Sequence, residues 1–137
     1  MKLWKPLVLG LMALFCMAGC AEKSLVSIEC PEISRGCTVD GLTVRAGQQP
    51  QILKPFELRV ESDEAGLADV TEVYASFAME GMDMGLNRYR LIRKSEGLWV
   101  AEVTLPLCVR GRADWLMRLE TRTRFGSKQY LLGFHTS

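Results

Sequence analysis

From residue 42 onward, apolar and polar side chains alternate with a period of two, a pattern typical of β-strands. The clearest stretch is 56–61, where Phe56, Leu58 and Val60 alternate with charged residues. Successive side chains of a strand point to opposite faces, so each stretch has one face for a core and one for water. No stretch carries a sustained helical period, and we therefore expect an all-β domain.

Seven strands are expected, each ended by a turn rich in Gly, Pro, Ser, Asn or Asp. They cover 42–46, 56–61, 70–79, 87–94, 99–105, the stretch from 115 to the turn at 125–127, and 130–134. Seven short antiparallel strands in about 100 residues predict an immunoglobulin-like β-sandwich, with a small closed barrel as the alternative.

The first 20 residues indicate where the protein works. Lys2 and Lys5 precede an apolar run that ends in Met17-Ala-Gly-Cys20, and that run is shorter than the ~20 residues of a membrane-spanning helix. The tetrad resembles a bacterial lipobox. The resemblance implies a lipoprotein signal peptide over 1–19 and a lipid on Cys20, with an ordinary secretory peptide as the alternative.

The predicted lipid anchor sets the remaining boundaries. No aspartate follows Cys20, so the resemblance favours the outer membrane of a Gram-negative cell, with the domain facing the periplasm. Residues 20–41 are expected to be a tether and irregular lead-in, and 42–137 the sandwich domain.

The charge of the mature chain excludes a nucleic-acid partner. Of 17 basic residues, Lys2 and Lys5 leave with the signal, which gives 15 against 16 acidic residues. The basic residues are scattered rather than gathered on one face, unlike those of a nucleic-acid-binding protein.

Three cysteines remain once Cys16 leaves with the signal and Cys20 is lipidated. Three allow one disulfide within the chain and one leftover thiol. In an up-and-down strand count Cys37 precedes the first strand and Cys108 follows the fifth, so the two should lie at opposite ends. The count therefore favours a Cys30–Cys37 disulfide and a free Cys108.

Three methionines fall within six residues: Met79, Met82 and Met84. Thioether sulfur is a soft ligand that suits Cu(I), and Gly81 and Gly85 allow the chain to turn so that the sulfurs converge. Methionine is also a pliable core filler, and Met79 continues the inward face of the third strand. Met82 and Met84 lie in a polar turn without a core to enter, so contact with a metal or with a protein partner is the expectation for them.

The same strand count brings other candidates to this turn. The turns after the third and fifth strands and the end of the seventh share one end of the domain. Met79, Met82, Met84, Cys108 and His135 are therefore expected together, with His135 as a further metal ligand.

No motif indicates an enzyme. His135 has no partnered nucleophile nearby in the sequence, and Ser76 and Ser95 lack the surroundings of an activated serine. Glu80 and Asp83 could act as paired carboxylates, but the turn that carries them is expected to be exposed, unlike a catalytic site. We therefore predict a protein without catalytic activity.

The stretch from Met79 to Asn87, followed by Gly97-Leu-Trp-Val-Ala101 and Gly111-Arg-Ala-Asp-Trp115, resembles the YtkA-like family of small extracytoplasmic domains. The resemblance spans roughly 56–134. It implies an immunoglobulin-like fold and a link to copper handling, including delivery to respiratory oxidases. The residues carried over are Met82 and Met84, and then Met79. The chain has no histidine beside these methionines and no Met/His-rich tail, so Cu(I) is the only metal expected.

Three functions stay open at this point. The first is a Cu(I)-binding lipoprotein. The second is an adhesion or scaffolding module that uses the Met turn as an apolar contact for a protein partner. The third is a hydrolase or redox enzyme, with only the thiol of Cys108 behind it.

Overall fold

The computed structural model describes residues 25–62, 67–82 and 84–137; the expected signal peptide and Cys20 lie outside these ranges. The all-β prediction is confirmed by nine strands and one short 3-10 helix. In chain order these are β1 (Leu25–Glu29), η1 (Ile33–Arg35), β2 (Cys37–Val39), β3 (Leu42–Ala46), β4 (Phe56–Glu61), β5 (Val70–Ala78), β6 (Arg88–Ser95), β7 (Leu98–Val103), β8 (Asp114–Thr123) and β9 (Gly126–His135). No helix within these ranges has the length and apolar character to cross a membrane.

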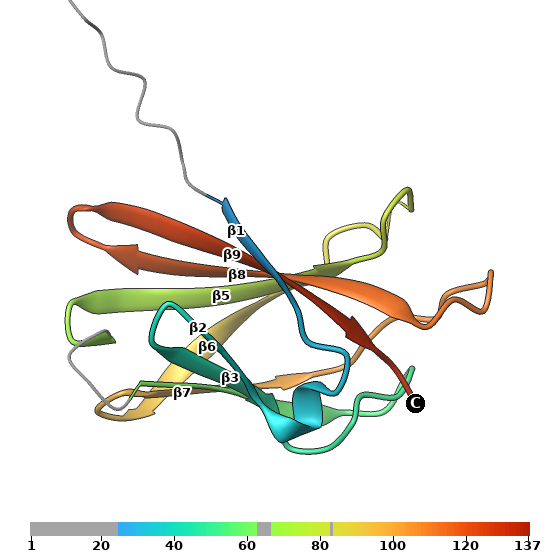
Figure 1. The fold of residues 1–137 in the computed structure, drawn as a ribbon, viewed down its shortest axis with the longest axis horizontal. Helices are drawn as coiled ribbons and strands as arrows, with labels where there is room; N and C mark the ends of the chain where they lie inside the picture. The colour runs from blue at the N-terminus through green and yellow to red at the C-terminus, as the bar shows by residue number, and fades with distance from the viewer. Residues whose placement is uncertain (1–24, 63–66, 83) are drawn as a thin grey trace, which may run out of the picture.

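The nine strands form one mixed sheet that curls until it is nearly closed (Figure 1). Its order is β1-β9-β8-β5-β6-β7-β4-β3-β2, with β1 and β9 parallel and the other neighbours antiparallel. β6 pairs with β5 along its first half and with β7 along its second half. The sheet therefore folds into two facing layers, and Figure 1 shows β1, β9, β8 and β5 above β2, β3 and β7.

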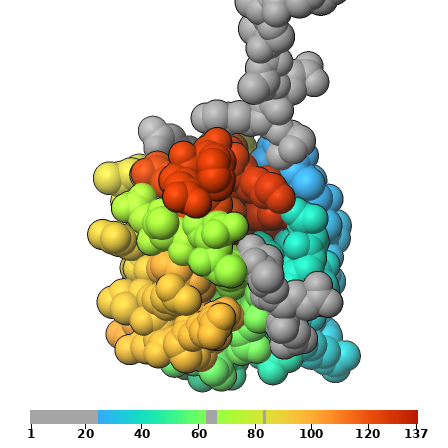
Figure 2. Space-filling view, turned by 90° about the vertical axis from the view of Figure 1, so that its left-hand side faces the viewer, coloured from blue at the N-terminus to red at the C-terminus, as the bar shows by residue number. Residues whose placement is uncertain are grey.

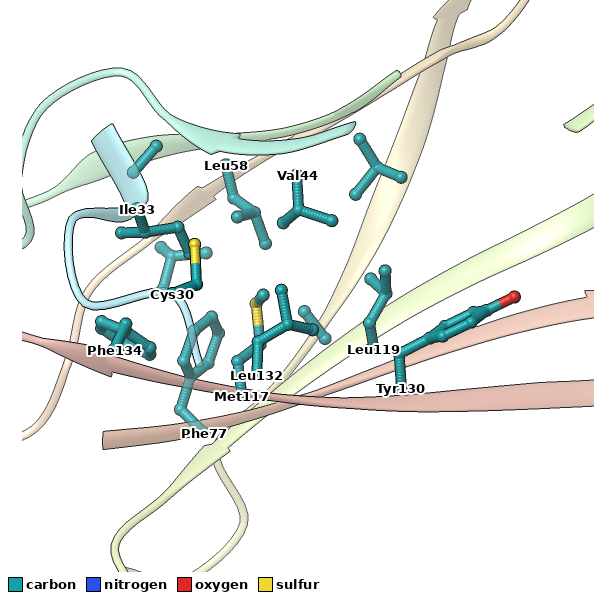
Figure 3. Close-up of a cluster of buried hydrophobic side chains, with 14 of the residues drawn as sticks. Cys30, Ile33, Val44, Leu58, Phe77, Met117, Leu119, Tyr130, Leu132 and Phe134 are labelled. Atoms are coloured by element: carbon teal, nitrogen blue, oxygen red, sulfur yellow. The ribbon is translucent and has the colours of Figure 1, made fainter. Parts of the chain in front are cut away.

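The core between the layers is built from the inward residues of each alternating stretch. On β8 these are Trp115, Met117 and Leu119, each at most 1% exposed. Figure 3 shows Met117 and Leu119 among the buried side chains. The ring of Phe77 on β5 makes edge-to-face contacts with Phe56 of the facing layer and with Phe134, at centroid distances of 6.4 and 6.1 Å. Burying one such side chain stabilises the fold by about 1.5–3 kcal/mol.

The expectation of seven antiparallel strands and an irregular lead-in was wrong. β3 to β9 match the seven predicted stretches, but the lead-in adds β1 and β2, and β1 is parallel to β9. β1 has little inward face of its own, since only Ile28 packs partly buried against the core, whereas Leu25 and Val26 are 48% and 40% exposed. Its structure comes from pairing with β9, which a period-two pattern does not reveal.

The outer strands β1 and β2 face each other across an open seam, and a disulfide and side-chain contacts bridge it. Cys30 follows β1, Cys37 begins β2, and the two form a disulfide with Cα atoms 6.0 Å apart. Elsewhere on the seam the hydroxyl of Tyr130, on β9, donates to Asp40, which follows β2, at 2.9 Å. The near-closure of the sheet therefore depends on side chains where the backbone ladder stops.

The disulfide has the expected pairing, but the reason given for it was wrong. The loop after Cys30 lies where β9 ends, because the carbonyl of Pro31 accepts from the amide of His135 at 3.2 Å. Gln49 fixes this arrangement, and its side-chain amide donates to the carbonyls of Pro31 and His135 at 3.0 and 2.5 Å. The extra strand β2 reverses the chain before β3, so the lead-in does not start at the end opposite Cys108.

Candidate metal centre

The turn after β5 (residues 79–85, the Met turn) begins inside the core and ends at its edge. Met79 is 2% exposed and continues the buried row of β5. Gly81 has a φ of 72°, a conformation that costs glycine little, and the amide of Met82 donates to the carbonyl of Met79 at 3.1 Å. The tight turn leaves Met82 half-buried against the end of the core.

The loop between β7 and β8 (residues 104–113) brings a thiol to the same place. Cys108 is 7% exposed and unbonded to any other cysteine, and its Sγ lies 3.7 Å from Sδ of Met82. The two residues stand 26 positions apart in sequence. The up-and-down strand count predicted that these two turns lie at the same end, and this prediction is confirmed. We call Met82 and Cys108 the sulfur pair.

The sulfur pair is in direct contact, with the Cys108 thiol donating to Met82 Sδ, and the same spacing would allow both sulfurs to bind one soft ion. Metal–thiolate bonds are about 2.3 Å long, so two sulfurs on one ion lie roughly 3.8 Å apart in tetrahedral geometry and roughly 4.6 Å apart in linear geometry. The observed 3.7 Å is close to the lower value. A thiolate and a thioether together are soft ligands, which favour Cu(I).

Arg112 ties the two turns together. Its Nη1 donates to the carbonyl of Glu80 in the Met turn at 2.8 Å, and its Nε donates to Asp114 Oδ1 at 3.0 Å. The Asp114 carboxylate raises the pKa of the Arg112 guanidinium, and the same hydrogen-bonded pair lowers the pKa of Asp114. Arg112 therefore holds Glu80, two residues before Met82, against the loop of Cys108.

Exposed aliphatic side chains lie in the loops at the same end of the molecule as the sulfur pair. Leu86 and Val109 are 95% and 88% exposed and flank the two turns. Leu107 is exposed in the Cys108 loop, and the amide of Leu53 donates to Leu105 at its start. Figure 1 shows the three loops at one end of the molecule. We call Leu53, Leu86, Leu107 and Val109 the aliphatic rim.

The other predicted ligands differ in how deeply they are buried. Met84 is half-buried against the core, and Met79 is a core residue. His135 is exposed and pairs with Asp114 across β8 and β9, where it lines a small pocket with Glu80. Asp83, weighed as a partner of Glu80, lies outside the described residues.

Sequence reasoning missed Arg112 and the aliphatic rim. The contact of Arg112 with Glu80 bridges 32 positions and leaves no local pattern in the sequence. The rim had a signal: Leu86, Leu107 and Val109 are large apolar residues in stretches with no alternation and no core to enter. In the part of the chain that the structure describes, no three His, Cys, Asp or Glu residues cluster as a metal site.

Comparisons with known proteins add little to this geometry. No protein-family model and no curated protein matches the chain. Among solved structures it is similar to the crystal structure of an engineered protein, with 16% identity and a TM-score of 0.50. The match covers 70% of this chain and 20% of that one, so this chain spans only a fifth of the engineered protein. At this identity the likeness concerns the fold alone.

Proposed function

We propose that the protein is a lipid-anchored domain of the cell envelope that binds Cu(I) through the sulfur pair. The observation that carries this proposal is the 3.7 Å approach of Cys108 Sγ to Met82 Sδ between two distant loops. Met84 is the third ligand in this proposal, because it shares the Met turn and is half-buried beside the core. Copper would enter as cargo, and the role is non-enzymatic.

Two features support a site of this kind outside the cytosol. Cys30 and Cys37 form a disulfide, which fits an oxidising compartment. Cys108, by contrast, is buried against Met82 and so is shielded from oxidants and other thiols. The anchor at Cys20, the periplasmic location and the immunoglobulin-like, YtkA-like assignment belong to the same proposal and rest on the sequence alone.

An anaerobic Cu(I) titration against a chromophoric chelator tests the site. The protein is the chain from Ala21 to Ser137, which contains all nine described strands. We expect one Cu(I) per chain, and at least about tenfold weaker binding in Met82→Leu and in Cys108→Ser. Leucine keeps the volume of methionine and removes only the sulfur ligand.

Met79→Leu is the matched control, since it removes a buried thioether from the same turn. Its affinity for Cu(I) should equal that of the wild type if Met79 is a core residue. No competition by the wild-type chain for Cu(I), or equal binding by all variants, would exclude the metal site.

A protein contact is the second candidate, and the aliphatic rim favours it. Four of the eight large apolar side chains that are exposed in the described residues gather at this end. Exposed apolar patches on soluble domains commonly mark interaction surfaces. In this second candidate function, the sulfur pair only packs beneath the surface that binds the protein partner.

Photo-crosslinking separates the two candidates. A crosslinking residue replaces Leu86, which is almost fully exposed, in cells that produce the full chain. A defined adduct that forms equally with and without a copper chelator would support the contact alone. An adduct that disappears with the chelator would link the contact to the metal.

A further inference from the structure

A second candidate site lies at the other end of the molecule from the Met turn. β8 runs from Asp114 beside the sulfur pair to Thr123, a length of about 30 Å. There the two layers open into a cavity of about 410 Å³. Figure 2 views this end, where the red β8–β9 turn, the green start of β5 and the teal β2–β3 hairpin come together. Mouths of curled sheets are common places for small-molecule sites.

Thr121 lines this cavity and is unusual for its burial. It is 5% exposed, and among the described residues it is the only buried polar side chain. It follows Trp115, Met117 and Leu119 on the inward face of β8, and its hydroxyl makes no hydrogen bond with any described residue. The oxygen is not one of the fully buried atoms that lack a partner, so it is open to the cavity, where water can bind it and a ligand hydroxyl could replace that water.

The walls of the cavity carry further hydrogen-bonding groups. The Tyr130 hydroxyl points away from the aliphatic core (Figure 3) and donates to Asp40, which also pairs with Lys128 at 3.6 Å. Asp69 is exposed and forms no ion pair with any described residue. Ser127 adds another hydroxyl to the lining. The cavity therefore offers free acceptors and donors from several strands.

An aromatic ring stands at the rim. Phe125, in the turn between β8 and β9, is 80% exposed and lines the same cavity. Such a ring face attracts the weakly positive C–H bonds of a ring laid against it. An exposed ring beside carboxylates and hydroxyls suits a molecule with one C–H face and many hydroxyls around its edge.

The lining also excludes other ligand classes. A lipid or other apolar ligand would cover the Thr121 hydroxyl without offering it a partner. A phosphate or other anion would meet the carboxylates of Asp40 and Asp69, with Lys128 already paired to Asp40. A neutral polyhydroxylated ring matches both the polar walls and the exposed phenyl ring.

We propose that this cavity binds a neutral sugar, with Asp69 and Thr121 as hydrogen-bonding partners of its hydroxyls and Phe125 stacked on its ring. The cavity volume accommodates one or two rings. The site is independent of the sulfur pair, so neither proposal depends on the other. A free sugar and the end of a polysaccharide present the same chemistry to it.

Titration of the ¹⁵N-labelled chain from Ala21 with cellobiose and with diacetylchitobiose tests the proposal. We expect at least one disaccharide to shift the amides of Asp40, Thr121 and Ser127 with a millimolar or lower Kd, and to leave Met82 and Cys108 unmoved. Thr121→Val and Asp69→Asn should each weaken binding severalfold. Thr43→Val, a threonine on β3 outside the cavity, is the matched control and should bind like the wild type.

Thr121→Val also separates binding from folding. Because no protein partner is lost, its melting temperature should equal or exceed that of the wild type, while sugar binding falls. No shift with either disaccharide at about 10 mM, a concentration above a millimolar Kd, would overturn the proposal. Shifts that persist unchanged in Thr121→Val and Asp69→Asn would overturn it as well.

Discussion

At the scale of the residue, Tyr130 shows how one hydroxyl responds to its surroundings. Burial raises its pKa to about 12, and the hydrogen bond to Asp40 adds to the effect because a phenolate beside a carboxylate is unfavourable. In the unfolded chain the phenol ionises near its ordinary pKa of 10. Between these two values the folded chain holds a proton that the unfolded chain has lost.

This difference gives a pH-dependent stability with a definite sign. Below pH 10 the contribution of Tyr130 is constant, and it is lost as the pH rises from 10 toward 12. Urea unfolding across this range should show the free energy of unfolding falling more steeply for the wild type than for Tyr130→Phe. Parallel curves for the two proteins would show that Tyr130 does not carry the effect.

At the scale of the element, the Met turn and the Cys108 loop form one unit because Arg112 bridges them. Neither loop has a regular ladder of its own, so their mutual position depends on few contacts. Losing the guanidinium contact with Glu80 should free the Met turn from the Cys108 loop. Opening of this unit would expose Cys108 to solvent.

Arg112→Gln should therefore raise the rate at which a thiol reagent modifies Cys108 severalfold. Arg110→Gln is the matched control, since Arg110 lies in the same loop, is exposed, and forms no ion pair with any described residue. Equal rates in the wild type and both variants would show that Arg112 does not hold the unit closed.

Elements also show what the sequence could predict. The seven alternating stretches predicted β3 to β9 and their inward faces, because a strand with one buried face needs an apolar residue at every second position. β2 has three residues, too few for a pattern, but Asp40-Gly41 was a usable signal. Both residues have positive φ, 50° and 78°, as in the two-residue turns for which Asp-Gly is preferred.

The candidate site was predictable only in part. The strand count predicted correctly that the Met turn and Cys108 lie at one end. In an up-and-down order, two turns share an end when an even number of strands separates them. The same argument failed for Cys37, where an unrecognised strand changed the count. The contact between Sγ and Sδ, and the bridge by Arg112, come from loop conformations that no periodicity encodes.

At the scale of the whole molecule, the seam between β1 and β2 is where the sheet can open. Removing the Cys30–Cys37 disulfide, which spans seven positions, should destabilise the fold by about 2.5 kcal/mol from loop entropy. Hydrogen exchange in Cys30→Ser/Cys37→Ser should rise first in β1, which has one neighbouring strand. Cys108→Ser keeps the disulfide and serves as the control. Uniform loss of protection over all strands of the double variant would contradict this order.

The same disulfide sets how the domain responds to force applied through its N-terminal end. A pull along the chain ahead of Leu25 acts lengthwise on β1, so the five residue pairs that join it to β9 are loaded together in shear. If β1 slides free, tension passes through the sulfur–sulfur bond to β2, and residues 31–36 carry none of it. Only residues 25–30 can then extend before the disulfide carries the load, which limits the extension to about 20 Å. If the proposed lipid on Cys20 holds the domain at a membrane, the disulfide would stop its extension one strand after the point of attachment.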